Sequence, residues 1–231
     1  MKLLAFETAT EGCSVAVYVD GAVRERFAVA PRQHATLALP WAGELLAEAG
    51  IARAQLDAIA VGIGPGAFTG VRLAVALAQG IALGLDRPVL PVSTLAVLAL
   101  SGRPGDIASG RELVAAIDAR MGEVYLGRFA TDGDGLVSAL GPEVLVAPDA
   151  ARADVPFDAL GIGSGFAAAA GVLVARLGLV DIHPDALPHA GDLARLAARD
   201  FIRGQAIAAD ALEPAYLRER VALTLVEQGK A

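Results

Sequence analysis

Cysteine is almost absent from this sequence of 231 residues, since Cys13 is its only one. A single cysteine cannot form an intrachain disulfide, and it leaves no Cys-x-x-Cys pair for a structural metal or for redox chemistry. Cys13 stands among small apolar residues, which favours a buried side chain over a nucleophile. The sequence therefore predicts a fold that is stable without cross-links and a reducing, cytoplasmic location.

Long apolar segments are also missing. Residues 1–7 contain one cation and a short apolar run that ends at an acidic residue, unlike the long apolar stretch of a signal peptide. The most apolar region, residues 73–85, is interrupted by Gln79, Gly80 and Gly84 and is shorter than the roughly 20 residues that a membrane-spanning helix needs. We therefore expect a soluble protein without an export signal or a membrane anchor.

Basic and aromatic residues are scarce. Lys and Arg number 19 against 26 Asp and Glu, which gives a net charge of −7, and only 5% of the residues are aromatic. Such a surface repels phosphate backbones unless its cations gather on one face, and it offers few rings for stacking on bases. Independent binding to RNA is therefore not expected, whereas a hydrophobic content of 55% leaves apolar surface for protein contacts.

Only three histidines are present: His34, His183 and His189. None lies four residues from another, so the chain cannot present two imidazoles one helical turn apart to a metal ion. His183 and His189 flank a proline-containing segment that predicts a solvated loop. A Ser14–His34 pair lacks the GxSxG nucleophile elbow of a hydrolase. The residues therefore predict no metal site and no catalytic residue.

The first half of the sequence predicts three strands, a helix, and then a strand and a helix joined by a glycine-rich loop. Asp20-Gly21 is a hairpin signal, so the sheet is expected to start antiparallel. Pro40 is expected to kink the first helix, and Gly50 to end it. The expected strands are residues 3–8, 14–19, 23–29, 57–63 and 89–92, and the expected helices are residues 33–49, 70–85 and 94–100.

A similar order of elements restarts after a turn-rich segment at residues 101–106. Strands are expected at residues 112–117, 123–130, 143–146 and 157–162, and a helix at residues 166–177. Two halves with the same order predict an α/β fold of two duplicated lobes, residues 1–102 and 103–231, with a C-terminal helix able to return to the first lobe. A single doubly wound sheet is the alternative, but the opening hairpin argues against it.

The glycine-rich loop GPGAFTG, residues 64–70, is the strongest local motif. Its glycines permit a sharp turn and leave amides at a helix N-terminus, where an anion could bind. A plain strand-to-helix turn capped by Thr69 is the more common use of such residues. The loop matches neither the P-loop nor the dinucleotide fingerprint. The candidate nucleotide or anion site comprises Glu7, Thr8, Gly64, Gly66, Thr69 and Gly70.

Five segments in the right order resemble the TsaB (YeaZ-type) family. Residues 64–72 are nearly identical to the family signature GPGSFTGVR, and residues 214–218 resemble its closing Pro-x-Tyr-x-Arg. The other matches are residues 4–16, residues 34–50 and residues 118–125. The resemblance covers essentially the whole chain. It implies an actin-like ATPase fold of two lobes, related to the TsaD (Kae1-type) threonylcarbamoyl transferases.

The resemblance also implies a function and partners. It implies a role in forming threonylcarbamoyladenosine at position 37 of tRNAs that read codons beginning with adenine. The implied role is that of a non-catalytic partner of a TsaD-type transferase and a TsaE-type ATPase, a homodimer in isolation, with tRNA contacted only through the complex. The helix pair of the first lobe is the implied partner surface, and a position in the core is the alternative for its residues. The implied interface residues are His34, Leu37, Trp41, Leu45, Val71, Val75 and Ala78.

Nucleotide binding stays open at this point. Residues 7–12 keep the acidity of an actin-like phosphate turn but lack its early glycine, so binding of ATP or ADP is expected to be weak or to depend on the complex. Glu7 and Asp118 end comparable strands and could form a paired-carboxylate site, but carboxylates that accept turn amides are the favoured interpretation. An actin-like small-molecule kinase or ATPase is the alternative function, and a metallopeptidase is a third.

Overall fold

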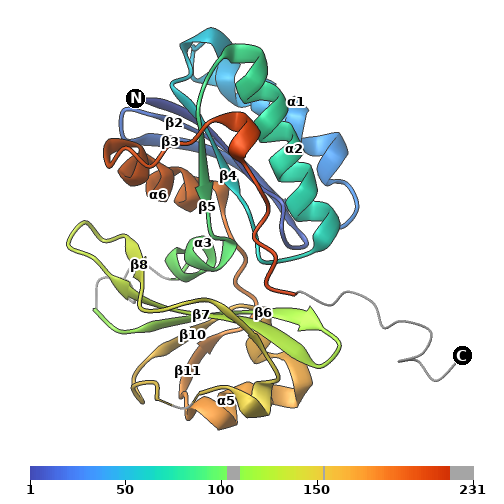
Figure 1. Cartoon of the computed structure of the whole chain (residues 1–231), viewed down its shortest axis with the longest axis vertical. Coiled ribbons are helices and arrows are strands. Elements are labelled where there is room, and N and C mark those ends of the chain that lie inside the picture. Colours follow the sequence, from blue (N-terminus) through green and yellow to red (C-terminus); the bar gives the residue numbers. More distant parts are fainter. Residues whose placement is uncertain (103–109, 153, 219–231) are drawn as a thin grey trace, which may run out of the picture.

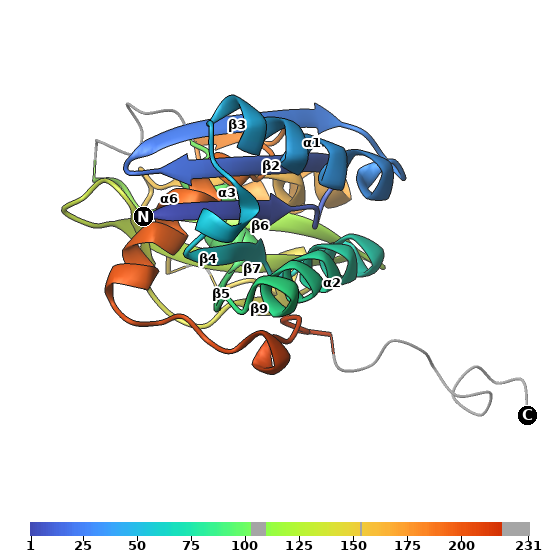
Figure 2. The ribbon, with the colours of Figure 1, turned by 90° about the horizontal axis from the view of Figure 1, so that it is seen from above.

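The computed structural model describes residues 1–102, 110–152 and 154–218, which form two sheets, one above the other in Figure 1. The upper sheet has the order β3-β2-β1-β4-β5, which can be followed from above in Figure 2. β1 pairs antiparallel with β2, and β2 with β3, whereas β4 and β5 run parallel to β1. The strands are β1 (Lys2–Glu7), β2 (Gly12–Val19), β3 (Ala22–Val29), β4 (Ala58–Gly62) and β5 (Val89–Val92).

The predicted hairpin is confirmed at Asp20 and Gly21, which both have positive φ, 49° and 97°. Two positive φ values in a two-residue turn match the twist of the flanking strands, so this sequence starts the sheet antiparallel.

Helices cover both faces of the upper sheet. Because alternate residues of a strand point to opposite faces, Leu4 and Phe6 of β1 pack under α1 (His34–Glu48) and α2 (Phe68–Leu85). Leu3 and Ala5 pack on the other face, where α3 (Thr94–Leu100) and α6 (Ala190–Ile202) lie. This explains why residues 3–6 of β1 are all apolar and do not alternate with polar residues.

The lower sheet repeats the pattern of an antiparallel pair extended by parallel strands. Its order is β11-β10-β6-β7-β8, with β9 also paired to β7. β6 is antiparallel to β7 and parallel to β10. α5 (Val172–Leu177) packs on this sheet. The strands are β6 (Leu113–Arg120), β7 (Glu123–Thr131), β8 (Val137–Ala139), β9 (Val144–Val146), β10 (Leu160–Ile162) and β11 (Asp181–His183).

In the second half one strand is shorter than predicted and two further predictions are wrong. The strand expected from residue 157 begins at Leu160. The helix expected over residues 166–177 is reduced to α5, because Ala169 and Ala170 adopt left-handed backbone angles that stop a right-handed helix. The solvated loop expected around His183 is instead strand β11, which pairs with β10. The predicted boundary at residues 101–106 lies mostly outside the described residues.

The C-terminal part of the described chain returns to the upper sheet. α6 packs on β1 and β2, and a short 3₁₀ turn at Ala209–Ala211 packs against α2. The chain then runs down beside α2 towards the gap between the sheets, as the red segment of Figure 1 shows. There the amide of Ala215 donates a 2.8 Å hydrogen bond to the carbonyl of Ile63, at the end of β4.

Candidate functional site

A cleft of about 1420 Å³ lies between the two lobes. Its walls come from segments that are far apart in the sequence, and both lobes contribute. They are the β1–β2 turn (residues 9–11), the approach to α1 (31–35), the start of α2 (66–73), the β6–β7 turn (117–121) and the C-terminal segment (215–218), together with Tyr125, Ser164, Ala167 and Ala168.

The glycine loop in the wall of this cleft is packed tightly on the β1–β2 turn. A Cβ at Gly66 would lie 2.4 Å from the carbonyl oxygen of Ala9, and one at Gly70 would lie 2.0 Å from that of Thr8. The Ala67 amide donates a 2.7 Å bond to the Ala9 carbonyl, and the Thr8 hydroxyl donates a 2.7 Å bond to the Gly70 carbonyl. Two glycines of this loop are therefore required because backbone meets backbone there.

The expected capping role of Thr69 is wrong. α2 begins at Phe68, so Thr69 lies inside its first turn, and the cap residue Ala67 has no side chain that can accept a hydrogen bond. The helix therefore starts two residues earlier than a Thr69 cap would require, and the Ala67 amide at its N-cap is bonded to Ala9.

Glu7 lies under the turn and is completely buried. Its carboxylate accepts hydrogen bonds from the Ala9 amide at 2.8 Å and from Thr94 Oγ1 at 3.1 Å. A Cβ at Gly62 would lie 2.0 Å from Glu7 Oε2, so the glycine makes room for the carboxyl. Burial raises the pKa of Glu7 to about 7, because the charged form loses its hydration.

Asp118 holds the matching position in the other lobe. Its carboxylate accepts a 2.8 Å hydrogen bond from the Arg120 amide, two residues on, as Glu7 does from Ala9. Asp118 lines the cleft, whereas Glu7 does not. The two carboxylates therefore accept turn amides and do not share a site on the cleft wall, in agreement with the favoured interpretation.

Three amides of the two turns already donate hydrogen bonds within the chain. In the first lobe the Ala9 amide is bonded to Glu7, and the Gly12 amide bonds Thr10 Oγ1 at 3.2 Å. In the second lobe the Arg120 amide is bonded to Asp118. Backbone amides that already donate within the chain cannot also cradle a phosphate. These three amides are therefore not available to a nucleotide phosphate.

The seven expected interface residues differ in how far they are buried. Four of them, Leu45, Val71, Val75 and Ala78, are buried in the core of the chain itself, so their side chains are not on its outer surface. Leu37 and Trp41 are partly buried against the same core. His34 Nε2 lies 3.0 Å from the Thr10 carbonyl, so this histidine holds the β1–β2 turn. The outer faces of α1 and α2 are formed by other residues.

The other two histidines lie elsewhere. His183 belongs to β11, and His189 Nδ1 lies 3.2 Å from Glu25 Oε1 of β3. Within residues 1–102, 110–152 and 154–218, no three His, Cys, Asp or Glu side chains are grouped as metal ligands would be. Ser14 is also engaged, since its hydroxyl donates to Glu25 and accepts from the Ala190 amide at 2.9 Å.

A contact that the sequence did not predict joins the first lobe to the C-terminal segment. Arg72 Nε donates a 2.7 Å hydrogen bond to the Tyr216 hydroxyl. Arg218 continues to the second lobe, where it lies 2.6 Å from Glu123 Oε2 and 3.0 Å from the Ala119 carbonyl. The only signal in the sequence was that both residues belong to segments that resemble the same family: Arg72 is the last residue of 64–72, and Tyr216 is the middle residue of 214–218.

Comparisons with known proteins agree with this architecture. The chain is 36% identical over 230 residues to the tRNA threonylcarbamoyladenosine biosynthesis protein TsaB of Escherichia coli, which covers 96% of each chain. The protein of the same name from Haemophilus influenzae is also 36% identical, over 96% of this chain and 95% of the relative. The chain belongs to the TsaB family. The solved structure of YeaZ from Pseudomonas aeruginosa superposes on this member of the TsaB family with a TM-score of 0.85 and 41% identity, over 94% of this chain and 99% of that one.

A wider relationship within the actin-like fold is also visible. The family described as TsaD, tRNA N6-adenosine threonylcarbamoyltransferase, matches residues 28–160 of this TsaB-family chain. That segment runs from the end of β3 through the glycine loop and into the second lobe. The two-lobe actin-like ATPase fold predicted from the sequence is thus confirmed.

Proposed function

We propose that this chain is a non-catalytic subunit of the cytoplasmic machinery that forms threonylcarbamoyladenosine at position 37 of tRNA, and that it binds a TsaD-type transferase. The names of its relatives support the pathway. The single observation that carries the partnership is the outer face of α2, which is exposed and has no charge.

Between Leu73 and Leu85, α2 contains no charged residue. Its buried side packs on the upper sheet, while its outer side exposes Ala76, Gly80, Leu83 and Gly84. By length and mean hydropathy, 1.6, this helix could even cross a membrane, although six of its residues are buried in the fold. A face this apolar is typical of a surface that a protein partner covers.

Small residues on this face favour a helical partner. A Cβ at Gly80 or Gly84 would meet no atom within 4 Å, so another backbone can approach closely at both positions. α1 packs beside α2 and exposes Leu39 on the same lobe. We propose that this outer face, not the buried residues of the same helices, packs against helices of the transferase or of a second copy of this chain.

The contacts at the cleft support a non-catalytic role. Glu7 is sealed under the β1–β2 turn, and the amide of Ala9 is bonded to it. The three histidines hold three separate positions, and the sequence has no His-x-x-x-His pair. These features do not favour the alternative of an actin-like kinase, which would require ATP turnover by this chain alone.

The test is a binding measurement with the TsaD-type protein of the same organism. Calorimetry and gel filtration would compare the wild type with Leu83→Glu, a change at a 64% exposed residue of α2. Leu140→Glu, at a 52% exposed residue of the other lobe, is the matched control. We expect a complex with the wild type and the control and a loss of binding of at least tenfold with Leu83→Glu, because a buried unpaired charge is costly.

A second arm tests the pathway. Deletion of the gene is expected to lower threonylcarbamoyladenosine in bulk tRNA, and wild-type protein but not Leu83→Glu is expected to restore it. Unchanged nucleoside levels in the deletion strain, or equal binding by Leu83→Glu and the wild type, would refute the proposal. Steady ATP hydrolysis by the isolated chain would favour the kinase alternative.

A further inference from the structure

We propose that the mouth of the interlobe cleft, centred on Arg72, holds the phosphate backbone of tRNA when this chain is part of its complex. The inference rests on the proposed function, which supplies the tRNA. It assigns a direct RNA contact to residues of this chain.

The charge of the cleft is opposite to that of the chain. The cleft is lined by four arginines, Arg32, Arg72, Arg120 and Arg218, and by Glu11 and Asp118, so its formal charge is +2, or +1 when Glu123, the ion-pair partner of Arg218, is included. The whole chain carries −7. An acidic protein can attract a phosphate backbone only where its few cations are gathered on one face. The fold gathers them here from four separate segments of the sequence.

Arg72 is positioned for recognition of an anion. Its Cζ lies 3.8 Å from the centroid of the Phe68 ring, and its Nε is bonded to the Tyr216 hydroxyl. In the described part of the chain, no carboxylate lies within 4.0 Å of this guanidinium. Stacking and one hydrogen bond orient the group, while its two terminal amino groups remain able to bind a phosphate in a bidentate way.

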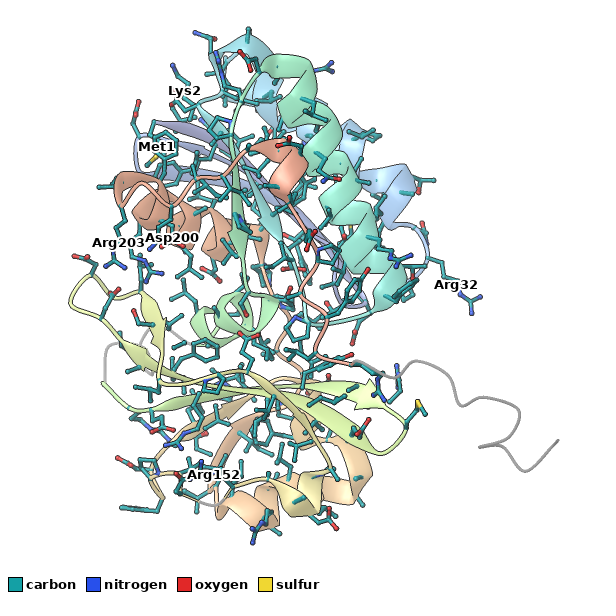
Figure 3. All side chains as sticks on the ribbon, in the orientation of Figure 1. Met1, Lys2, Arg32, Arg152, Asp200 and Arg203 are labelled. Carbon is teal, nitrogen blue, oxygen red and sulfur yellow. The ribbon has the colours of Figure 1, made fainter. Side chains whose placement is uncertain are left out.

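Two more arginines stand at the rim on unusual backbone. Arg32 and Arg120 have φ of 68° and 63°, in the left-handed region that non-glycine residues rarely adopt. At Arg120 the tight turn between β6 and β7 accounts for this angle and holds the side chain at the cleft wall. Figure 3 shows the Arg32 side chain extending into solvent beside the first lobe. Arg120 is 86% exposed and pairs with Asp118 at 2.8 Å, an ion pair that water screens and a phosphate can replace.

Aromatic rings lie beside the arginines. Phe68 and Tyr216 are half-exposed, and their ring centroids are 6.2 Å apart. Rings placed next to cations are the usual combination in sites that bind single-stranded RNA, because bases stack on the rings while the cations hold the phosphates. Arg218 has a different task, since its bond to Glu123 fixes the segment that carries Tyr216.

An RNA occupant fits better than a protein here. The proposed protein surface is the uncharged outer face of α2, which needs no cations. A protein partner does not require that an acidic chain collect its arginines in one cleft, whereas a polyanion does. The part of the cleft mouth around Arg72 is therefore better suited to bind a phosphate group than a protein surface.

The test uses the full-length chain in its complex with the TsaD-type transferase. Fluorescence anisotropy would measure the affinity for labelled tRNA at several KCl concentrations, with Arg72→Gln, Arg72→Lys and Arg32→Gln. The matched control is Arg152→Gln, a 90% exposed arginine of the lower lobe that Figure 3 places far from Arg32. We expect Arg72→Gln to weaken binding about three- to tenfold and to reduce the slope of log K against log salt by roughly 0.7–0.9, one phosphate contact.

The variants distinguish an effect of the Arg72 charge on tRNA binding from an effect on folding. Arg72→Lys is expected to keep most of the salt slope, because it keeps the charge, and to have intermediate affinity, because it loses the bidentate geometry. Thermal unfolding of each variant would show that the fold is retained. Arg152→Gln is expected to match the wild type.

Other outcomes overturn the inference. Unchanged tRNA affinity and salt slope for Arg72→Gln in an intact complex would refute it. Loss of the transferase complex by Arg72→Gln would assign the cleft mouth to a protein partner and would also refute it. If the wild type does not bind the transferase, the proposed function fails. The same tRNA titration is then made with the chain alone at low salt. Binding that depends on Arg72 supports the inference, and no binding refutes it.

Discussion

Thr94 Oγ1 donates a 3.1 Å hydrogen bond to Glu7 Oε2, and it does so at the point where the two lobes meet. The preceding residue, Ser93, donates to Glu143, which lies between β8 and β9 of the other lobe. The burial of Glu143 raises its pKa. Two neighbouring hydroxyls at the start of α3 thus bind the buried carboxyl of Glu7 from one lobe and the partly buried carboxyl of Glu143 from the other. α3 therefore connects the two lobes through both carboxyls, and burial raises the pKa of each.

Glu7 predicts a specific dependence of stability on pH. Its pKa is about 7 in the fold and 4.5 in the reference state, so the folded state retains the proton over that interval. A raised carboxyl pKa means that stability from this group is greatest below pH 4.5 and declines as the pH rises to 7. Glu7→Gln does not titrate. Relative to the wild type it should gain on the order of 3 kcal/mol between pH 4.5 and 8.

Urea denaturation at pH 5, 6, 7 and 8 measures this difference. Leu140→Gln, at a half-exposed position of the other lobe, introduces no titratable group and is the control, which should differ from the wild type by a constant amount. A difference between Glu7→Gln and the wild type that does not change with pH would show that Glu7 is hydrated in the fold.

Two glycines of α2 should respond in opposite ways to alanine. At Gly70 a Cβ would lie 2.0 Å from the Thr8 carbonyl, so the loop would have to move, at a cost of about 2 kcal/mol or more. At Gly80 a Cβ would meet nothing, and alanine should stabilise the helix by about 0.5–1 kcal/mol. Chemical denaturation of both variants checks the pair. Equal effects at the two positions would contradict the packing of the glycine loop on the β1–β2 turn.

The contact between His189 and Glu25 should stabilise the docking of α6 in acidic conditions. The hydrogen bond to Glu25 raises the pKa of His189. Burial opposes ionisation of Glu25, but the bonds from His189 and Ser14 outweigh it and lower the pKa of Glu25. The His189 contribution is complete below pH 6.5 and is lost as the pH rises past the raised pKa. The Glu25 contribution is present above pH 4.5 and is lost as the pH falls.

His189→Gln is therefore expected to cost roughly 0.5–1 kcal/mol at pH 5.5, a value reduced for solvent screening of this part-exposed pair, with less effect at pH 8.5. Unfolding at the two pH values measures the change. A larger cost at pH 8.5 than at pH 5.5 would contradict the assigned sign.

Replacing two leucines of α1 should show which of its faces is buried in the core and which is exposed. Leu45 is buried, so Leu45→Ala is expected to cost about 2–4 kcal/mol of unfolding free energy. Leu39 is half-exposed, so Leu39→Ala is expected to cost less than about 1 kcal/mol. Denaturation of the two variants measures this. A larger loss at Leu39 would mean that the outer face of α1 is already covered within the folded chain.

Local patterns in the sequence predicted much of the first lobe. Asp20 and Gly21 occur in the type of turn that their side chains prefer, and the strand before the glycine loop is apolar because both of its faces are buried. The second lobe was predicted less well, because Ala169 and Ala170 leave the helical region although alanine is the strongest helix former.

The sequence alone determined the two-lobe order of elements and the antiparallel opening of the first lobe, because turn chemistry and apolar periodicity act over a few neighbouring residues. It also determined the family, because five of its segments resemble the family's motifs in order. Only the tertiary structure decided which faces of α1 and α2 are buried and that Glu7 is sealed from water. It also decided that Ser14 would meet the start of α6 and that Arg72 would meet Tyr216, 144 positions further along the chain. Contacts over such distances depend on how the elements pack, and the residues that make them carry no local sign of their partners.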